Sequence, residues 1–179
     1  MELFDIHGKP TEAVSVLAFT KLLSPHFDIE SEVPGDLCCK KNKARVDMLL
    51  HPKFRWQNGS QHPIAFEIKK INNKEIKAQA QATDYAQCSW NSSRYSHPVS
   101  TFVAIFAPNF ETAKIGNIPF NHYLGSNGVM LMQLDYYYTQ WFEEKRFRGL
   151  KLTLNGHTVW SSLYGPQGNF SAQRKFGSR

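Results

Sequence analysis

The segment at 63–70, PIAFEIKK, combines the pattern of a core strand with charged side chains in its middle. Successive side chains of an extended chain point to opposite faces, so the isoleucines and the phenylalanine fall on one face while Glu67 and Lys69 fall on the other. These two charged residues lie roughly 7 Å apart along the strand. The segment therefore predicts a carboxylate and an ammonium group side by side on one strand face.

Residues 45–50 repeat this alternation and put Asp47 on the polar face. The segment that connects the two strands contains Asn58-Gly59, a dipeptide suited to the positive φ angles of a hairpin turn. We therefore predict a hairpin in which Asp47 and Glu67 meet. Two carboxylates this close repel each other unless a cation lies between them, so the pair favours a hard divalent metal, for which Mg²⁺ is the natural candidate.

Asp47, followed by Glu67-x-Lys69 on the neighbouring strand, resembles the signature of the PD-(D/E)XK nuclease superfamily. The spacing Gln81-x-x-x-Tyr85 resembles the additional helix motif of the branch that includes the RecB nuclease domain and lambda exonuclease. Each motif is short, and Glu-x-Lys alone occurs three times in the chain. The resemblance therefore depends on the order of elements: a helix, a strand, the Asp strand, the Glu-x-Lys strand, and a helix with Gln and Tyr.

This resemblance implies metal-dependent hydrolysis of DNA phosphodiester bonds. It implies that Asp47 and Glu67, with the backbone carbonyl of Ile68, bind one or two Mg²⁺ ions, for which Mn²⁺ can substitute. Lys69 would position the attacking water or stabilise the charge that develops at phosphorus.

In many members of the superfamily, a glutamate from the first helix also reaches the metal. Here the first helix is expected from residue 10 to about residue 23, and Glu12 lies in its first turn on the same face as Val16. Glu12 is accordingly a candidate catalytic residue and metal ligand. A carboxylate in a first turn can equally stabilise the helix dipole, and Glu30 and Glu32 compete for the role of third acid.

The alanine- and glutamine-rich segment up to about residue 88 predicts a helix that starts near residue 73. Its residues Lys74, Lys77, Gln81 and Tyr85 share one face, which would border the metal site, with Gln81 and Tyr85 orienting the substrate or the catalytic lysine. A polar helix surface is the alternative. The candidate DNA-binding residues around the site are Lys43, Arg45, Lys70, Lys74 and Lys77.

The composition fits a single domain that binds a polyanion. The chain has 179 residues, 41% of them hydrophobic and 13% aromatic, which is enough for a sizeable core. Its net charge of +6 favours a nucleic-acid partner. The apolar runs are too short to cross a bilayer and the first residues lack the basic start of a signal peptide, so we expect a cytoplasmic protein with no membrane partner.

We predict an α/β fold of the restriction-endonuclease-like type, with a mixed sheet of about five strands flanked by helices. Residues 1–164 would form one nuclease domain with its core at about 10–135. A strand at 27–33 would end at Pro34-Gly35, and the continuous apolar runs at 102–107 and 129–134 would form the centre of the sheet.

The C-terminal part is expected to lie outside this core. A hairpin at about 150–162, turning at Asn155-Gly156, reads as an appendage. The Gly- and Ser-rich segment 165–179 reads as a flexible basic tail. Residues 136–148 interleave aromatic and basic side chains, which suits base stacking and phosphate contact but is also typical of a packed amphipathic segment.

Two other functions stay open at this point. One is a catalytically inactive DNA-binding or assembly protein that keeps the fold, and the other is an RNA endonuclease with the same metal site. The Gln-Tyr motif favours a nuclease that processes DNA ends or branches in recombination, repair, or mobile-element or phage DNA processing. A chain this small could also form a homo-oligomer that encloses DNA.

Overall fold

The computed structural model describes residues 12–37, 43–69, 75–106, 114–115, 117–139 and 144–168. Its helices are α1 (Glu12–Leu23), α2 (Glu75–Tyr85) and α3 (Phe120–Ser126). Its strands are β1 (Phe27–Leu37), β2 (Lys43–Pro52), β3 (Ile64–Ile68), β4 (Cys88–Trp90), β5 (Val99–Ser100), β6 (Phe102–Phe106), β7 (Lys114–Ile115), β8 (Ile118–Pro119), β9 (Val129–Thr139), β10 (Glu144–Leu154), β11 (His157–Ser161) and β12 (Gly165–Pro166). None of the helices within these ranges has the length and hydrophobicity required to span a bilayer.

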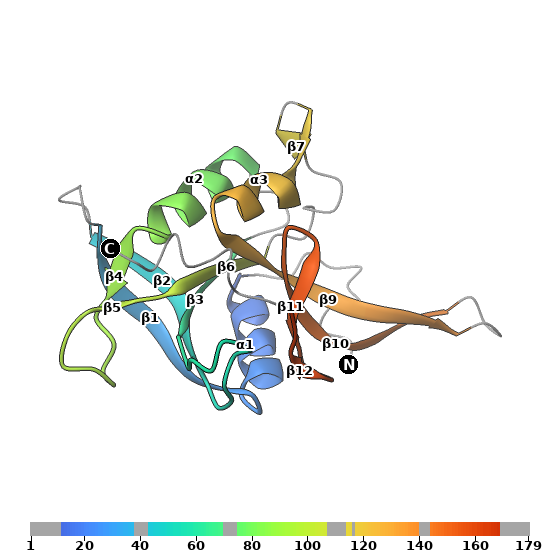
Figure 1. The fold of residues 1–179 in the computed structure, drawn as a ribbon, viewed down its shortest axis with the longest axis horizontal. Coiled ribbons are helices and arrows are strands. Elements are labelled where there is room, and N and C mark those ends of the chain that lie inside the picture. The colour runs from blue at the N-terminus through green and yellow to red at the C-terminus, as the bar shows by residue number, and fades with distance from the viewer. Residues whose placement is uncertain are drawn as a thin grey trace.

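One large mixed sheet dominates the described chain (Figure 1). It has ten strands in the order β12-β11-β10-β9-β6-β3-β2-β1-β4-β5. Most neighbours are antiparallel, but β3, β6 and β9 run parallel, with α2 and α3 in the connections between them. The expected mixed α/β class is confirmed. The expected count of about five strands is wrong, because hairpins on both sides of the parallel centre pair with the same sheet.

Two hydrophobic clusters lie on opposite faces of the sheet. The apolar residues of β3, including Phe66 and Ile68, pack with Phe19 and Leu23 of α1. On the other face, Ala65 belongs to a cluster that also contains residues of α2 and α3. The alternation expected from the sequence of β3 is therefore present, and it directs Glu67 toward α2.

The β2–β3 hairpin sets the register of the charged residues. Its pairs include Met48 with Phe66 and Leu50 with Ile64, so Asp47 lies across from Glu67 as predicted. The connection is longer than a tight turn and closes at Gly59, whose φ is +80°. Its neighbour Asn58 keeps an ordinary φ and accepts hydrogen bonds from Ser60 instead.

The expected end of β1 at Pro34-Gly35 is wrong, because the strand continues to Leu37. Pro34 has no N–H to donate, but its carbonyl accepts a hydrogen bond of 2.9 Å from the backbone N–H of Asn91. Gly35 lies against the indole of Trp90, and a Cβ at this position would be only 2.5 Å from a ring carbon. This glycine therefore allows close packing between strands rather than a turn.

The C-terminal hairpin is part of the core and not an appendage. It turns at Asn155 and Gly156, which both have positive φ, as the dipeptide predicts. Trp160 of β11 is fully buried and packs edge-on against Phe27, with ring centroids 5.2 Å apart. The first residues of the expected tail form β12, which pairs with β11, while residues 169–179 lie outside the described part of the chain.

Replacing Trp160 tests the role of this hairpin. We expect Trp160→Ala to lower the free energy of unfolding by about 3–5 kcal/mol, because it removes a buried aromatic side chain and leaves a cavity. Urea unfolding measures the change. Leu163→Ala, at a side chain that is 50% exposed, is the control and should change stability by less than about 0.5 kcal/mol. Equal stability of the two variants would show that the hairpin is an appendage after all.

Candidate active site

Five of the six candidate catalytic residues come together on the face of the sheet that α2 covers. Asp47 lies on β2, Glu67 lies on β3, and Lys69 follows the end of β3. Gln81 and Tyr85 lie on α2, one helical turn apart, so both side chains reach the same side of the helix. Hydrogen bonds connect these side chains to one another or to the adjoining backbone.

Glu67 is at the centre of this cluster. Its Oε1 accepts hydrogen bonds from Lys69 Nζ at 2.6 Å and from Gln81 Nε2 at 2.9 Å. Lys69 Nζ also donates to Gln81 Oε1, so the three side chains form a closed ring of contacts. The side chains of Lys69 and Glu67 are only 11% and 6% exposed, so this ion pair is shielded from solvent.

Gln81 and Tyr85 hold this arrangement in place. Gln81 Nε2 donates to the hydroxyl of Tyr85 at 2.6 Å, and that hydroxyl donates to the backbone carbonyl of Arg45 at 2.6 Å. The ring of Tyr85 packs edge-on against Trp90, with centroids 5.2 Å apart. The Gln-x-x-x-Tyr pair thus ties α2 to β2 while it orients the amide that contacts both Glu67 and Lys69.

Asp47 brings a second carboxylate beside Glu67. Its Oδ2 accepts a hydrogen bond of 2.7 Å from the backbone N–H of Ile68, and its own N–H lies 3.4 Å from Glu67 Oε2. Burial, and then repulsion from Asp47, raise the pKa of Glu67 to about 7, although Lys69 opposes both. Burial and the nearby Glu67 carboxylate also raise the pKa of Tyr85 to about 12, so its hydroxyl stays protonated and can donate at neutral pH.

The donor set of this pair fits a small hard cation. Mg²⁺ in enzymes is commonly bound by one or two carboxylates, with water and substrate phosphate completing the coordination. Within the described residues, no group of three or more His, Cys, Asp or Glu side chains could hold a metal. The groups here that would hold such a cation are the carboxylates of Asp47 and Glu67 and the backbone carbonyl of Ile68.

Of the three candidates for the third acid, the two with described side chains, Glu30 and Glu32, are not in this cluster. Glu12 is the first residue of α1, but its side chain lies outside the described ones. Glu32 has a positive φ of +52° and forms an ion pair with Arg45 at 3.8 Å, in which both side chains are more than two-thirds exposed. Glu30 belongs to a different network, so it is not available to a metal beside Glu67.

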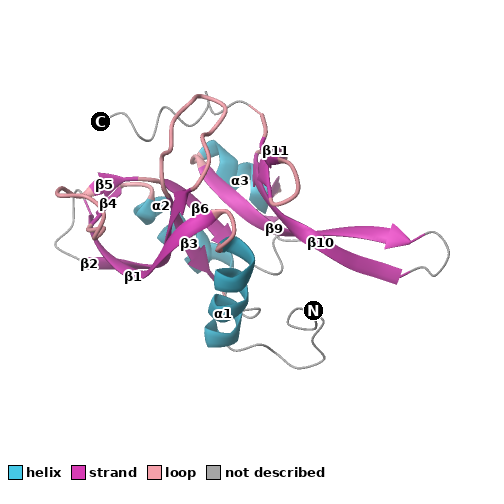
Figure 2. Cartoon of the chain, turned by 90° about the horizontal axis from the view of Figure 1, so that it is seen from below, coloured by secondary structure: helices cyan, strands magenta, loops and turns pink. Residues whose placement is uncertain are grey.

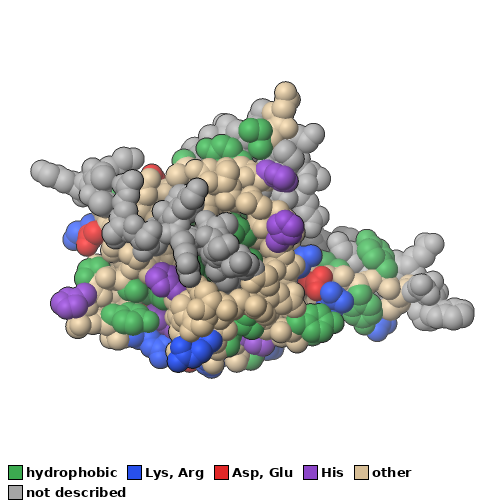
Figure 3. All heavy atoms as spheres, viewed as in Figure 1, with side chains coloured by type: hydrophobic (Ala, Val, Ile, Leu, Met, Phe, Trp, Pro, Cys, Tyr) green, Lys and Arg blue, Asp and Glu red, His purple; other side chains and the backbone are tan. Residues whose placement is uncertain are grey.

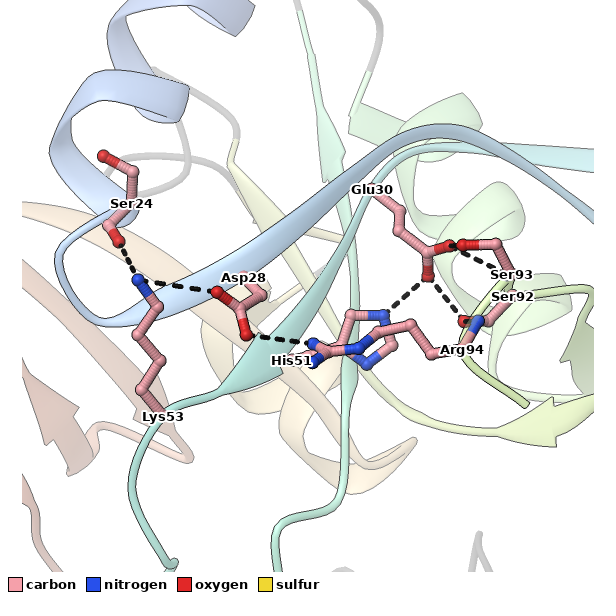
Figure 4. A network of polar contacts seen from close by, with 8 residues as sticks. All are labelled: Ser24, Asp28, Glu30, His51, Lys53, Ser92, Ser93 and Arg94. Atoms are coloured by element: carbon pink, nitrogen blue, oxygen red, sulfur yellow. Dashed lines mark hydrogen bonds and ion pairs between the residues drawn. The ribbon is translucent and has the colours of Figure 1, made fainter.

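That network ties the loop after β4 to β1 and β2 (Figure 4). Glu30 Oε2 is 2.7 Å from His51 Nε2 and accepts a hydrogen bond of 2.5 Å from Ser92 Oγ. Burial raises the pKa of Glu30, but the hydrogen bonds from Ser92, Ser93 and His51 outweigh it and lower the pKa to about 2. The sequence gives no signal for this network, because Ser92 follows Glu30 by 62 positions.

Among the candidate DNA-binding residues, only two have described side chains. Lys43 and Arg45 are exposed on β2, in the part of the strand that precedes Asp47. Lys70 and Lys74 lie outside the described residues, and the side chain of Lys77 on α2 is not among the described ones. The structure therefore places two exposed cations on the strand that carries Asp47.

The raised pKa of Glu67 predicts a stability effect in the metal-free protein. A carboxylate with a folded pKa of about 7 and an ordinary value of 4.5 stabilises the fold below pH 4.5. That contribution is lost as the pH rises through 7, at a cost of about 3 kcal/mol. Glu67→Gln avoids this cost. We therefore expect the unfolding free energy of the variant, relative to that of the parent, to rise by up to about 3 kcal/mol between pH 5 and pH 8.

Urea unfolding in EDTA at the two pH values measures this gain. Glu30→Gln is the matched control, because the pKa of Glu30 is lowered and its stabilising effect is already present above pH 4.5. The unfolding free energy of Glu30→Gln should be lower than that of the parent by a similar amount at pH 5 and pH 8. A parallel pH dependence for Glu67→Gln and the parent would contradict the proposed repulsion at Glu67.

Comparison with known proteins gives no information on the function of this site. No protein-family model matches the chain, and searches of curated proteins and of solved structures found no match. The family assignment therefore stays a proposal based on the residues and contacts described above.

Proposed function

We propose that this protein is a metal-dependent nuclease that hydrolyses DNA phosphodiester bonds. The observation that carries the proposal is the buried cluster in which Lys69 and Gln81 both contact Glu67 beside the carboxylate of Asp47. Holding the buried Glu67 beside the partly buried Asp47 is costly to the fold when both are charged, so the arrangement suits a site that recruits a cation. Strained electrostatics of this kind are typical of functional sites.

The topology around the cluster supports a restriction-endonuclease-like core. The elements α1, β1, β2, β3, α2 and β6 follow the order of helix, strands and helix that the resemblance implies. Strands β1, β2 and β3 are antiparallel neighbours, and β6 lies parallel to β3 after a connection that contains α2. The further strands on either side would then be additions to that core.

The chain's own residues would act by holding charge in fixed places. Asp47 and Glu67, with the Ile68 carbonyl, would hold Mg²⁺ or Mn²⁺, which when bound neutralises the scissile phosphate and lowers the pKa of a bound water. Lys69 would place its ammonium group next to the scissile phosphate and stabilise the negative charge that develops there.

Gln81 would limit the positions that the Lys69 side chain can adopt, because its amide oxygen accepts from Nζ while its NH₂ group contacts Glu67 and Tyr85. Tyr85 in turn fixes the amide through its bond to the backbone of Arg45. These two residues would therefore be positioning residues. The net charge of +6 and the exposed Lys43 and Arg45 on β2 favour a polyanionic substrate.

Cleavage assays with matched variants test this function. End-labelled single-stranded, blunt duplex, nicked and branched DNA would be incubated with Mg²⁺ or Mn²⁺. We expect cleavage by the parent, and a loss of about 10²–10³-fold in rate for Asp47→Asn and Lys69→Ala, because each removes a charged group at the reacting phosphate. The affinity of Lys69→Ala for DNA should stay within a few-fold of the parent.

Two controls separate chemistry from folding in this assay. Lys21→Ala removes an exposed cation on α1, on the other face of the sheet, and should leave the rate unchanged. Glu30→Gln removes a partly buried acid of the separate network and should retain cleavage at a temperature where it is folded. Absence of cutting of any DNA with either metal would overturn the proposal, and cutting of RNA alone would reassign the substrate.

A further inference from the structure

Strands β9 and β10 continue beyond the sheet as a long two-stranded arm, which is seen in both ribbon views (Figures 1 and 2). The described part of the arm pairs Tyr136 with Phe147 and Tyr137 with Arg146. Phe147 packs against the cluster beneath α1, and the ring of Tyr136 lies 5.9 Å from that of Phe147. Because side chains alternate, Tyr137 and Arg146 lie on the opposite face of the arm.

This opposite face carries mostly basic and aromatic side chains. Arg148 Nε donates to Asp135 at 2.6 Å, and Lys151 pairs in register with Gln133. Among the described side chains, three basic ones and one acidic one therefore line the face over about 15 Å of strand. In the space-filling view, basic, acidic and apolar or aromatic side chains lie next to one another along the arm (Figure 3).

Two tyrosine rings flank these charges. Tyr137 is 42% exposed and Tyr164 is 70% exposed. Tyr164 follows the turn at Ser162, whose Oγ accepts a hydrogen bond of 2.9 Å from the backbone N–H of Leu150, so it lies near Arg148. The hydrogen bond from Arg148 to Asp135 raises the pKa of Arg148, and Tyr164 adds to this effect. Exposed aromatic rings beside guanidinium groups are the combination that binds unpaired bases by stacking while the cations hold phosphates.

The same face leads to the candidate active site. Glu67 on β3 is in register with Ile105 on β6, which is in register with Leu131 on β9. Leu131 belongs to the cluster on the α2 face, and alternation places Gln133, Asp135 and Tyr137 on that face as well. Since adjacent strands are about 4.8 Å apart, the face begins about 10 Å from Glu67 and extends beyond the carboxyl ends of the parallel strands.

We propose that the arm face formed by Asp135, Tyr137, Arg146, Arg148, Lys151 and Tyr164 binds single-stranded DNA. The bound strand would be the one that enters or leaves the site at Glu67. This link between the arm and the site rests on the proposed nuclease function. Single strands are favoured over duplex because paired bases hide the surfaces on which the two tyrosines would stack.

The binding test is independent of cleavage. Fluorescence anisotropy of a labelled oligothymidylate would be measured in EDTA, in the Lys69→Ala background, so that neither metal nor cutting contributes. We expect Tyr137→Ala combined with Tyr164→Ala to weaken binding by roughly 10- to 100-fold, given the usual strength of base stacking. Replacing Arg146, Arg148 and Lys151 by Ala should weaken binding and reduce its salt dependence.

Matched controls are present in the same chain. Tyr138 is 70% exposed and lies next to Tyr137 in the strand, where alternation directs it to the other face, so Tyr138→Ala should leave binding within about two-fold. Arg55→Ala removes an exposed arginine of the β2–β3 connection and should likewise have little effect. Thermal melts of all variants would confirm that they are folded.

Several outcomes would overturn the inference. They are unchanged DNA binding by the double tyrosine variant, and a loss of binding for Tyr138→Ala equal to that of the double variant. Tighter binding of duplex DNA, or of RNA of the same length, than of single-stranded DNA would also overturn it. If cleavage is absent but the arm variants lose single-strand binding as expected, the nuclease proposal fails while the arm remains a DNA-binding surface. If cleavage depends on Lys69 but the arm variants bind normally, only the arm assignment fails.

Discussion

The buried contact between Glu67 and its neighbours is the constraint on which the rest of the site depends. Glu67 lies beside a second carboxylate, that of Asp47, and both burial and repulsion disfavour its charge. Lys69 offsets part of this cost at 2.6 Å, and Gln81 fixes the geometry through a second hydrogen bond. Two carboxylates side by side, one of them with a raised pKa, are what would favour binding of a divalent cation at the proposed metal site.

The architecture of the sheet explains how this cluster can exist. The pair arises from neighbouring strands of one hairpin, so its separation is set by backbone hydrogen bonds rather than by flexible side chains. The Tyr85 hydroxyl then anchors α2 to the backbone of β2, which prevents the helix from moving away from the carboxylates. The same sheet face continues along β9 to the basic and aromatic arm, so the proposed metal site and the proposed DNA-binding surface lie on one face.

The local features of the site could be predicted from sequence because they depend on short periodicities. Alternation placed Glu67 and Lys69 on one face, and helical spacing placed Gln81 and Tyr85 on one side of α2. Features that depend on distant contacts could not be predicted: Gly35 continues a strand because Trp90 packs on it, and Trp160 is buried because hairpins far apart in sequence share one sheet. The same holds for Glu30, whose contacts with Ser92 and His51 join residues that are far apart in the sequence.

The most direct test of the account is to locate a divalent cation in the crystalline protein. Crystals soaked with Mn²⁺ would be measured at a wavelength where manganese gives an anomalous signal, alongside crystals of Asp47→Asn. We expect a manganese peak within coordination distance of the carboxylates of Asp47 and Glu67, and its weakening or loss in the variant. A cation bound elsewhere, or none at concentrations that support cleavage, would contradict the claim that this carboxylate pair is the metal site.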